Sequence, residues 1–172
     1  MPQERPGAVT FMGRGLTLVG DALKVGDKAP DFIVLTEKLS DYTIVETIGP
    51  RLFTTFPSLD TPVCDSHLKR LIQEIPQLGG LAVYAVSADL PFAQKRWADA
   101  NGAAGVTFLS DYRDASFGTN WGVLIKEARL LARSVFILDS DDVVKYVDVV
   151  TELTALPDFD KLLAFLRQTK IS

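Results

Sequence analysis

The stretch that decides the fold covers residues 54–64 and reads Thr54-Thr55-Phe56-Pro57-Ser58-Leu59-Asp60-Thr61-Pro62-Val63-Cys64. The residues before Pro57 are almost all apolar or β-favouring, which is typical of a central strand buried on both faces. Pro57 ends this strand. Thr61 followed by Pro62 signals a helix start, because Thr is a good N-cap and Pro fits the first helical position. The stretch therefore predicts a buried strand, a tight loop and a helix with Cys64 in its first turn.

Around this stretch the chain alternates strand and helix signals. Hydrophobic periodicity and turn residues predict strands over 32–35, 43–45, 52–56, 81–87, 106–109, 133–138 and 143–150, and helices over 62–75, 89–100 and 157–168. The runs 9–12 and 16–19 predict a β-hairpin, and residues 111–131 are expected to hold a helix and a loop. The aspartate-rich segment 139–142 is interpreted as the turn of a second hairpin, between the last two strands. This order indicates a three-layer α/β domain with a mixed sheet.

Composition bounds the class of protein. With 47% hydrophobic and 23% charged residues, the 172-residue chain matches a globular protein with a substantial core. A net charge of −4 without a basic run gives no reason to expect nucleic acid or an anionic membrane as a partner. No repeat, linker or low-complexity segment divides the chain, so we expect a flexible tail over residues 1–8 and a single domain over residues 9–172. The start of the chain lacks the apolar core of a secretory signal, and no apolar stretch approaches the ~20 residues that span a bilayer. We therefore expect a cytoplasmic protein.

The chain has one cysteine, Cys64, and one histidine, His67. A single cysteine excludes an intramolecular disulfide, and one Cys with one His is too few for structural zinc, so we expect no metal and no cofactor. At a helix start the free backbone N–H groups and the helix dipole favour an anion, which here is the thiolate of Cys64. These features predict that Cys64 is a reactive thiol.

Two motifs resemble a known family. The pattern Pro57-x-x-x-Thr61-x-x-Cys64 is the active-site motif of the peroxiredoxins. Together with the segment Ser87-Ala88-Asp89-Leu90-Pro91-Phe92-Ala93-Gln94, residues 56–64 are similar to the bacterial thiol peroxidase branch, and the similarity extends over residues 9–168. It implies a thioredoxin-like fold, with a mixed central sheet flanked by helices and an N-terminal β-hairpin. It also implies homodimers that reduce hydrogen peroxide and organic hydroperoxides.

The resemblance also assigns roles to single residues. Cys64 is implied as the peroxidatic cysteine, and Pro57 and Thr61 are implied as active-site residues. The hydroxyl of Thr61 could donate to the sulfur or to a bound peroxide oxygen. The active-site arginine of the family lies at the start of a late strand, and Arg133 matches that place. Its guanidinium would stabilise both the thiolate and the leaving group.

The chain departs from the thiol peroxidase branch at Trp97, which stands where these relatives carry a second, resolving cysteine. The usual intrachain disulfide therefore cannot form. Cys64 would become a sulfenic acid, which an external thiol such as thioredoxin, glutaredoxin or a small thiol would have to reduce. We interpret Trp97 as a packing residue.

Two other functions compete with a one-cysteine peroxidase. A redox sensor or partner-binding module would keep the same site and pass its oxidation to another protein through a mixed disulfide. A Cys–His hydrolase would need His67 in contact with Cys64. We expect His67 at a solvated helix position instead, where its replacement would have little effect. The carboxylates of Asp60, Asp65 and Asp89 are expected to be cap and turn residues, and the aromatic rings of Phe92 and Trp121 to be core or dimer contacts.

Overall fold

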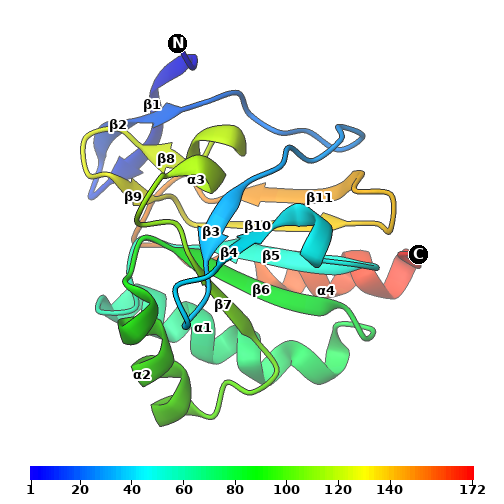
Figure 1. The fold of residues 1–172 in the computed structure, drawn as a ribbon. Coiled ribbons are helices and arrows are strands. Elements are labelled where there is room, and N and C mark those ends of the chain that lie inside the picture. The colour runs from blue at the N-terminus through cyan, green and yellow to red at the C-terminus, as the bar shows by residue number, and fades with distance from the viewer.

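The central element of the computed structural model, which describes all 172 residues, is a seven-stranded mixed sheet (Figure 1). Its strands lie in the order β11 (Val144–Val149), β10 (Ser134–Leu138), β5 (Arg51–Thr55), β6 (Ala82–Ser87), β7 (Thr107–Ser110), β3 (Ile33–Leu35) and β4 (Asp41–Thr43). The pairs β5–β6 and β6–β7 are parallel, whereas the other pairs are antiparallel. This is the thioredoxin-like fold, and it confirms the predicted mixed sheet.

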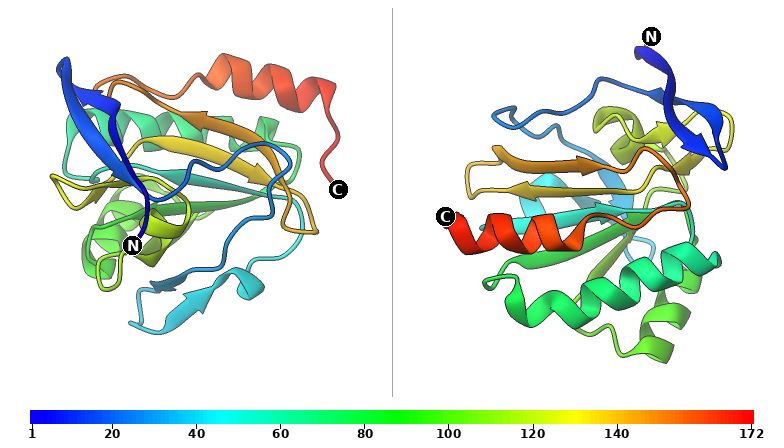
Figure 2. Two further views of the ribbon diagram at one scale, coloured as in Figure 1. Left: turned by 90° about the horizontal axis from the view of Figure 1, so that it is seen from above. Right: turned by 180° about the vertical axis from the view of Figure 1, so that it is seen from behind.

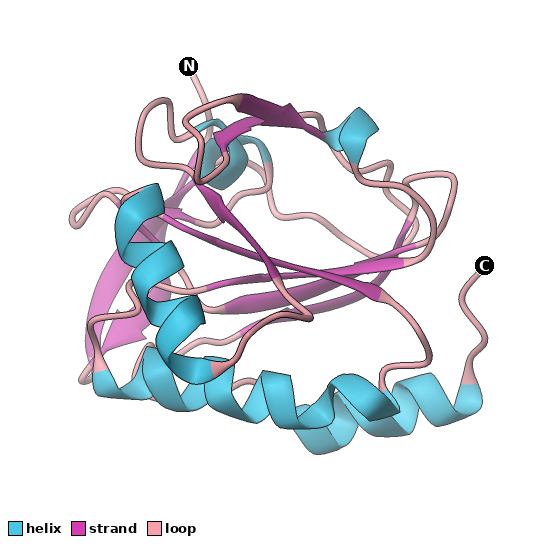
Figure 3. Cartoon of the chain, turned by 60° about the horizontal axis from the view of Figure 1, so that its bottom comes forward, coloured by secondary structure: helices cyan, strands magenta, loops and turns pink.

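Helices cover one face of this sheet. They are α1 (Pro62–Glu74), α2 (Pro91–Asn101) and α4 (Phe159–Gln168), and Figure 3 shows all three on the same side. Figure 2 shows α4 alongside α1, where the guanidinium of Arg70 lies 5.0 Å from the ring centre of Phe159. Both faces of the central strands are buried. In β5, Leu52 packs toward these helices, while Phe53 packs into the cluster on the opposite face. The prediction of a central strand before Pro57 is confirmed.

On the opposite face lies a four-stranded sheet in the order β1 (Glu4–Phe11), β2 (Arg14–Val19), β8 (Leu124–Ile125) and β9 (Leu130–Leu131), with the short helix α3 (Ser116–Asn120) beside it. The strands β1 and β2 form the predicted N-terminal hairpin. The segment expected as a flexible tail, residues 1–8, includes the first part of a strand, because β1 already begins at Glu4. The guanidinium of Arg5 donates to the carbonyl of Gly20 at 2.9 Å, and it also bonds the carbonyl of Gly122. This strand is mostly exposed, so it lacks the apolar alternation that would have revealed it. The single domain over residues 9–172 stays a prediction.

The structure also bears on a predicted strand, a predicted turn and two aromatic side chains. The strand expected over 43–45 lies at 41–43 instead, because Thr43 and Glu46 form a capping box that starts a 3-10 helix, η1 (Ile44–Glu46). The turn 139–142 joins β10 and β11 as predicted, and the carboxylate of Asp139 accepts backbone N–H groups within it. Of the two aromatic side chains expected in the core or at a dimer contact, Trp121 is buried and Phe92 is exposed. No helix has the length and apolar character needed to cross a bilayer.

Candidate active site

The sheet topology brings the end of β5 next to the start of β10. These strands are antiparallel, and Ser134 at the start of β10 lies opposite Thr55 at the end of β5. The chain leaves β5 through Pro57 into α1. Because the strands run in opposite directions, Arg133 enters β10 at the same edge of the sheet where α1 begins. Residues about 70 positions apart in the sequence are thus placed side by side.

The start of α1 holds Cys64 as the sequence predicts. Thr61 is the N-cap, and its hydroxyl accepts the backbone N–H of Cys64 at 3.4 Å. The same hydroxyl donates to the carbonyl of Ser58 at 3.0 Å, so it would have to turn before it could donate to the sulfur or to a peroxide. Pro62 occupies the first turn of the helix. The side chain of Cys64 is completely buried there.

Arg133 is the charged group of the site. Its Nη2 lies 3.4 Å from Sγ of Cys64, and both Nη2 and Nε donate to the carbonyl of Leu153 at 2.9 and 3.3 Å. Only 1% of Arg133 is exposed, and no carboxylate forms an ion pair with it. A buried cation without an anionic partner is costly. The sulfur of Cys64 is the group within reach of this cation that could carry a negative charge.

His67 is the one residue of the site that sequence reasoning placed wrongly. Its side chain is fully buried between the rings of Phe56 and Phe159, at centroid distances of 5.9 and 6.0 Å. Nδ1 lies 3.0 Å from Nη1 of Arg133, and Nε2 lies 2.9 Å from Oγ1 of Thr54. The expected solvated position is therefore incorrect. The helical spacing could have revealed this, because His67 follows Cys64 by three residues on the buried side of α1.

The surroundings of His67 fix its protonation state. Burial, followed by the positive charge of Arg133, holds the pKa of His67 well below its ordinary value of 6.5, so the ring is neutral. Arg133 can only donate, so Nδ1 must accept and the hydrogen must lie on Nε2, which donates to Thr54. The hydroxyl of Thr54 in turn donates to the carbonyl of Ser134 at 2.8 Å. Both ring nitrogens of His67 are thus engaged away from Cys64, and the Cys–His hydrolase hypothesis receives no support.

A carboxylate from the second predicted motif braces the loop between β5 and α1. Asp89 accepts the hydroxyl of Ser58 at 2.7 Å and the backbone N–H of Leu59 at 2.9 Å, and it also accepts the hydroxyl of Ser87 at 2.7 Å. Gln94 donates to Ser87 at 3.0 Å. The interpretation of Asp89 as a cap and turn residue missed this contact across two segments. The brace gives a physical reason for the Ser87–Gln94 segment, since it fixes the loop that carries Thr61.

Trp97 lies on α2 and packs toward α1, in agreement with the predicted packing role. It is 9% exposed within the hydrophobic cluster beneath the sheet, and its indole N–H donates to the carboxylate of Asp65 at 2.9 Å. Lys69, and then Trp97, lower the pKa of Asp65 by hydrogen bonding to its carboxylate. Asp65 directly follows Cys64, so Trp97 ties α2 to the first turn of α1.

A cavity of about 520 Å³ opens beside the site. Pro57, Thr61 and Arg133 are among its lining residues, so the three residues predicted around Cys64 meet at one cavity. Its other lining residues include the apolar side chains of Phe11, Leu16, Val63, Ile125, Leu130 and Leu153, together with the charged side chains of Arg14 and Glu127. The hairpin and the β8–β9 segment therefore cover the start of α1 and form a passage with apolar sides.

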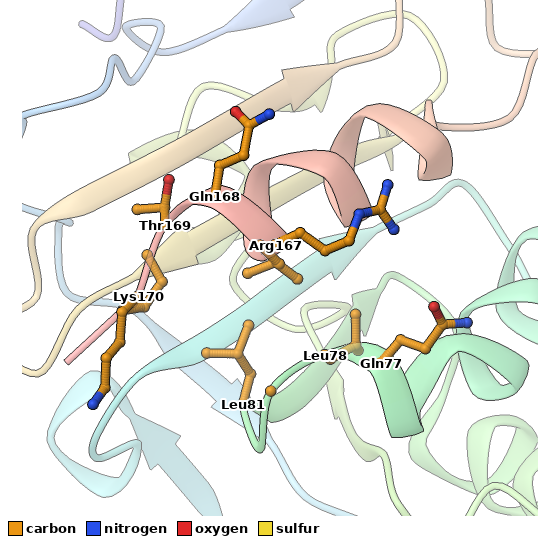
Figure 4. A pocket seen from close by; sticks show the side chains of 10 residues that line it. Gln77, Leu78, Leu81, Arg167, Gln168, Thr169 and Lys170 are labelled. Carbon is orange, nitrogen blue, oxygen red and sulfur yellow. The ribbon is translucent and has the colours of Figure 1, made fainter.

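A second cavity, of about 460 Å³, contains none of the predicted site residues. It lies between the end of α4 with the C-terminal segment and the turn after η2 (Ile75–Gln77), and Figure 4 shows Gln77, Leu81 and Arg167 around it. Because α1 has 13 residues, this cavity is about 20 Å from the first turn of that helix. The candidate active site is therefore the cavity beside Arg133.

A thioredoxin-like fold that holds a single cysteine in the first turn of a helix, beside a buried arginine, is the arrangement of a thiol peroxidase. Comparisons with known proteins agree. The Redoxin family model matches residues 24–163. The thiol peroxidase of Bacillus subtilis is 50% identical over 154 residues, covering 89% of this chain and 92% of that protein. The thiol peroxidase of Halalkalibacterium halodurans is 48% identical over 155 residues, covering 90% and 93%.

Solved structures point to the same group. A peroxiredoxin-like protein from Aquifex aeolicus matches with a TM-score of 0.84 and 37% identity, over 94% of this chain and 96% of that one. The chain belongs to the redoxin family, and within it to the peroxiredoxins. It is a thiol peroxidase.

The neutral state of His67 predicts a pH dependence of stability. Above pH 6.5 the ring is neutral in both the folded and the unfolded chain. Below that value the unfolded chain binds a proton that the folded chain excludes, so the free energy of unfolding should decrease by up to about 1.4 kcal/mol per pH unit. The variant His67→Asn keeps an acceptor near Arg133 but cannot titrate, so it should lack this slope. Urea unfolding of both proteins between about pH 5 and 8 measures it.

Asp111 contributes an opposite slope, because burial raises its pKa to about 6 and the folded chain then binds the extra proton. Both proteins contain Asp111, so the difference between their curves isolates His67. Parallel curves would contradict the neutral assignment.

Proposed function

We propose that the chain reduces hydroperoxides through Cys64 in a one-cysteine cycle. The thiolate attacks one peroxide oxygen, so that an S–O bond forms while the O–O bond breaks. The second oxygen leaves as hydroxide or alkoxide and takes up a proton, giving water or an alcohol, and Cys64 is left as a sulfenic acid. The observation that supports this most directly is Nη2 of Arg133 at 3.4 Å from Sγ, with no carboxylate to neutralise it.

The surrounding residues have defined tasks in this proposal. The guanidinium of Arg133 stabilises the thiolate before attack and the charge on the leaving oxygen during it. Thr61 fixes the first turn of α1 through the N–H of Cys64 and can turn its hydroxyl from Ser58 to a bound peroxide oxygen. Pro57 is buried, lines the same cavity as Thr61 and Arg133, and helps to keep water out of the site.

An external thiol must complete the cycle, because the chain has no second cysteine. The thiol sulfur attacks the sulfenic sulfur and water leaves, which gives a mixed disulfide. A second thiol then releases Cys64 and departs as the disulfide. Thioredoxin, glutaredoxin or a small thiol could supply these electrons. Since Cys64 is completely buried, the first turn of α1 must open before any such thiol can reach it.

The apolar passage favours organic hydroperoxides in addition to hydrogen peroxide. A hydroperoxide with an apolar group could place that group against Phe11, Leu16 and Leu130 while its O–O bond reaches Arg133. Hydrogen peroxide needs only the polar groups of Thr61 and Arg133. The passage therefore supports discrimination between peroxides by their apolar part.

We also propose that the chain works as a homodimer in the cytoplasm. The resemblance to the thiol peroxidase branch supports the dimer, and exposed apolar side chains such as Phe92 and Leu90 are available for a contact. A reducing compartment would supply the external thiol that the cycle needs. Sedimentation equilibrium measures the first point, and a monomer at all concentrations would contradict it.

The cycle predicts oxidation without turnover when no thiol is present. Peroxide should convert Cys64 to a sulfenic acid that dimedone traps, as mass spectrometry of the Cys64 peptide would show. Steady consumption of peroxide should begin only when thioredoxin, glutaredoxin or dithiothreitol is added, and Cys64→Ser should be inactive. If no dimedone adduct forms on Cys64, the proposal is wrong. A single oxidation that ends in a persistent mixed disulfide with one protein would instead support the sensor function.

The apolar passage predicts a split between substrates. Phe11→Ala removes part of the wall of the passage, and a loss of ~1 kcal/mol of apolar contact corresponds to about a fivefold decrease in kcat/KM. We expect this decrease for cumene hydroperoxide and no change for hydrogen peroxide. Ile48→Ala, which shortens an exposed apolar residue outside the passage, is the control and should change neither value. Equal effects of Phe11→Ala on both peroxides would rule out a binding role for this wall.

A further inference from the structure

Glu152 gathers an unusual number of hydrogen bonds between the N-terminal hairpin and the segment that follows β11. One carboxylate oxygen accepts the hydroxyl of Thr10 at 2.8 Å and the backbone N–H of Gly13 at 3.0 Å. The other accepts the backbone N–H of Met12 at 3.2 Å, and the backbone N–H and hydroxyl of Thr154 at 2.9 and 2.7 Å. The donors of Thr154, followed by those of the hairpin, hold the pKa of Glu152 well below its ordinary value. The carboxylate is therefore the ionised centre of a five-donor clamp.

Backbone hydrogen bonds reinforce this clamp on both sides of Glu152. The N–H of Thr10 donates to the carbonyl of Thr151 at 2.7 Å, and the N–H of Leu153 donates to the carbonyl of Thr10 at 2.8 Å. Thr10 and Glu152 thus form a parallel bridge. The hairpin and the 151–154 segment are held as one unit, although about 140 residues separate them in the sequence.

The residue that follows Glu152 connects this unit to the active site. The carbonyl of Leu153 accepts both Nε and Nη2 of Arg133, and that same Nη2 faces Sγ of Cys64. A guanidinium is planar, so its orientation is set by the acceptors that it meets. Only two acceptors besides the sulfur fix it here, the carbonyl of Leu153 and Nδ1 of His67. The position of the Leu153 carbonyl therefore sets the direction of Nη2 toward the sulfur.

We propose that Glu152 is a positioning residue for the peroxidase reaction, which it serves by clamping the hairpin to the Leu153 peptide that orients Arg133. The inference rests on the proposed function, because it assumes that Arg133 acts on Cys64. It joins two parts of the site that are distant in sequence. The hairpin supplies Phe11 and Leu16 to the wall of the passage, and the Leu153 carbonyl orients the guanidinium toward the sulfur. Glu152 itself does not line the cavity and does not touch the reacting atoms.

The test compares Glu152→Gln with the wild-type chain. Glutamine keeps the size of the side chain, but an NH2 group replaces one carboxylate oxygen. Because this NH2 group cannot accept a hydrogen bond, at least one backbone N–H that faced the carboxylate loses its acceptor. We expect the second-order rate constant for oxidation of Cys64 by hydrogen peroxide to fall about tenfold, since small displacements of an aligned catalytic group cost this much or more. Glu152→Ala should lower it further. Rapid mixing followed by dimedone trapping and mass spectrometry measures the rate.

A second readout does not depend on peroxide. The rate at which iodoacetamide alkylates Cys64 follows the thiolate fraction, so its pH profile should move to higher pH in Glu152→Gln as Arg133 loses its alignment. If the variant only lowered the free energy of unfolding, the molecules that remain folded would keep the wild-type alkylation profile. If the wild-type chain fails to react with peroxide, the proposed function fails, while the alkylation profiles still decide the role of Glu152.

The matched control is Asp139→Asn. Asp139 is also a carboxylate that accepts two backbone N–H groups in a hairpin turn, but it lies at the far end of β10 from Arg133. This variant should keep both the oxidation rate and the alkylation profile within about twofold of the wild-type values, whatever its melting temperature. The inference is overturned if folded Glu152→Gln matches the wild-type chain in both readouts. It is also overturned if Asp139→Asn lowers the oxidation rate and moves the alkylation profile as much as Glu152→Gln does.

Discussion

A guanidinium without a carboxylate partner, buried at the edge of the sheet, is the constraint on which the rest of this site depends. Removing the charge of Arg133 from water is costly, and the fold offsets the cost with the carbonyl of Leu153, the lone pair of His67 and the sulfur of Cys64. Two of these acceptors are neutral. The positive charge therefore acts chiefly on the sulfur.

The same charge explains features that look unrelated to chemistry. His67 must stay neutral because a proton on Nδ1 would point at Nη1 of Arg133, and its burial beside Phe56 and Phe159 keeps it so. The tautomer then directs Nε2–H to Thr54, which closes the chain of hydrogen bonds back onto the strand that carries Arg133. Each donor in this chain has one acceptor. A network with only one consistent set of donors holds the guanidinium more rigidly than packing alone would.

What the sequence predicts well is local, and what it misses is long-range. Thr61, Pro62 and Cys64 fall within one helix start, so N-cap preference and spacing alone locate the thiol in the first turn. The place of Arg133 needed the family resemblance, because the antiparallel pairing of β10 with β5 leaves no local signal. The contacts of Asp89 with Ser58 and of Glu152 with the hairpin also join distant segments, so no local sequence signal predicts them. The strand over residues 4–8 was not predicted because an exposed strand lacks apolar alternation. His67 was predicted to be solvated because histidine is a polar residue, although its position in the helix lies on the buried side.

The geometry that favours oxidation of Cys64 also hinders its reduction. Arg133 contacts the sulfur, Thr61 caps the helix turn that carries it, and the side chain of Cys64 is completely buried, so a thiol on another molecule can reach the sulfur only if this turn opens. This chain has no internal second thiol, and the bond from Trp97 on α2 to Asp65 fastens the turn that must open. The stability of the first turn of α1 therefore sets how long the sulfenic acid persists, and with it the balance between reduction by an external thiol and further oxidation by peroxide.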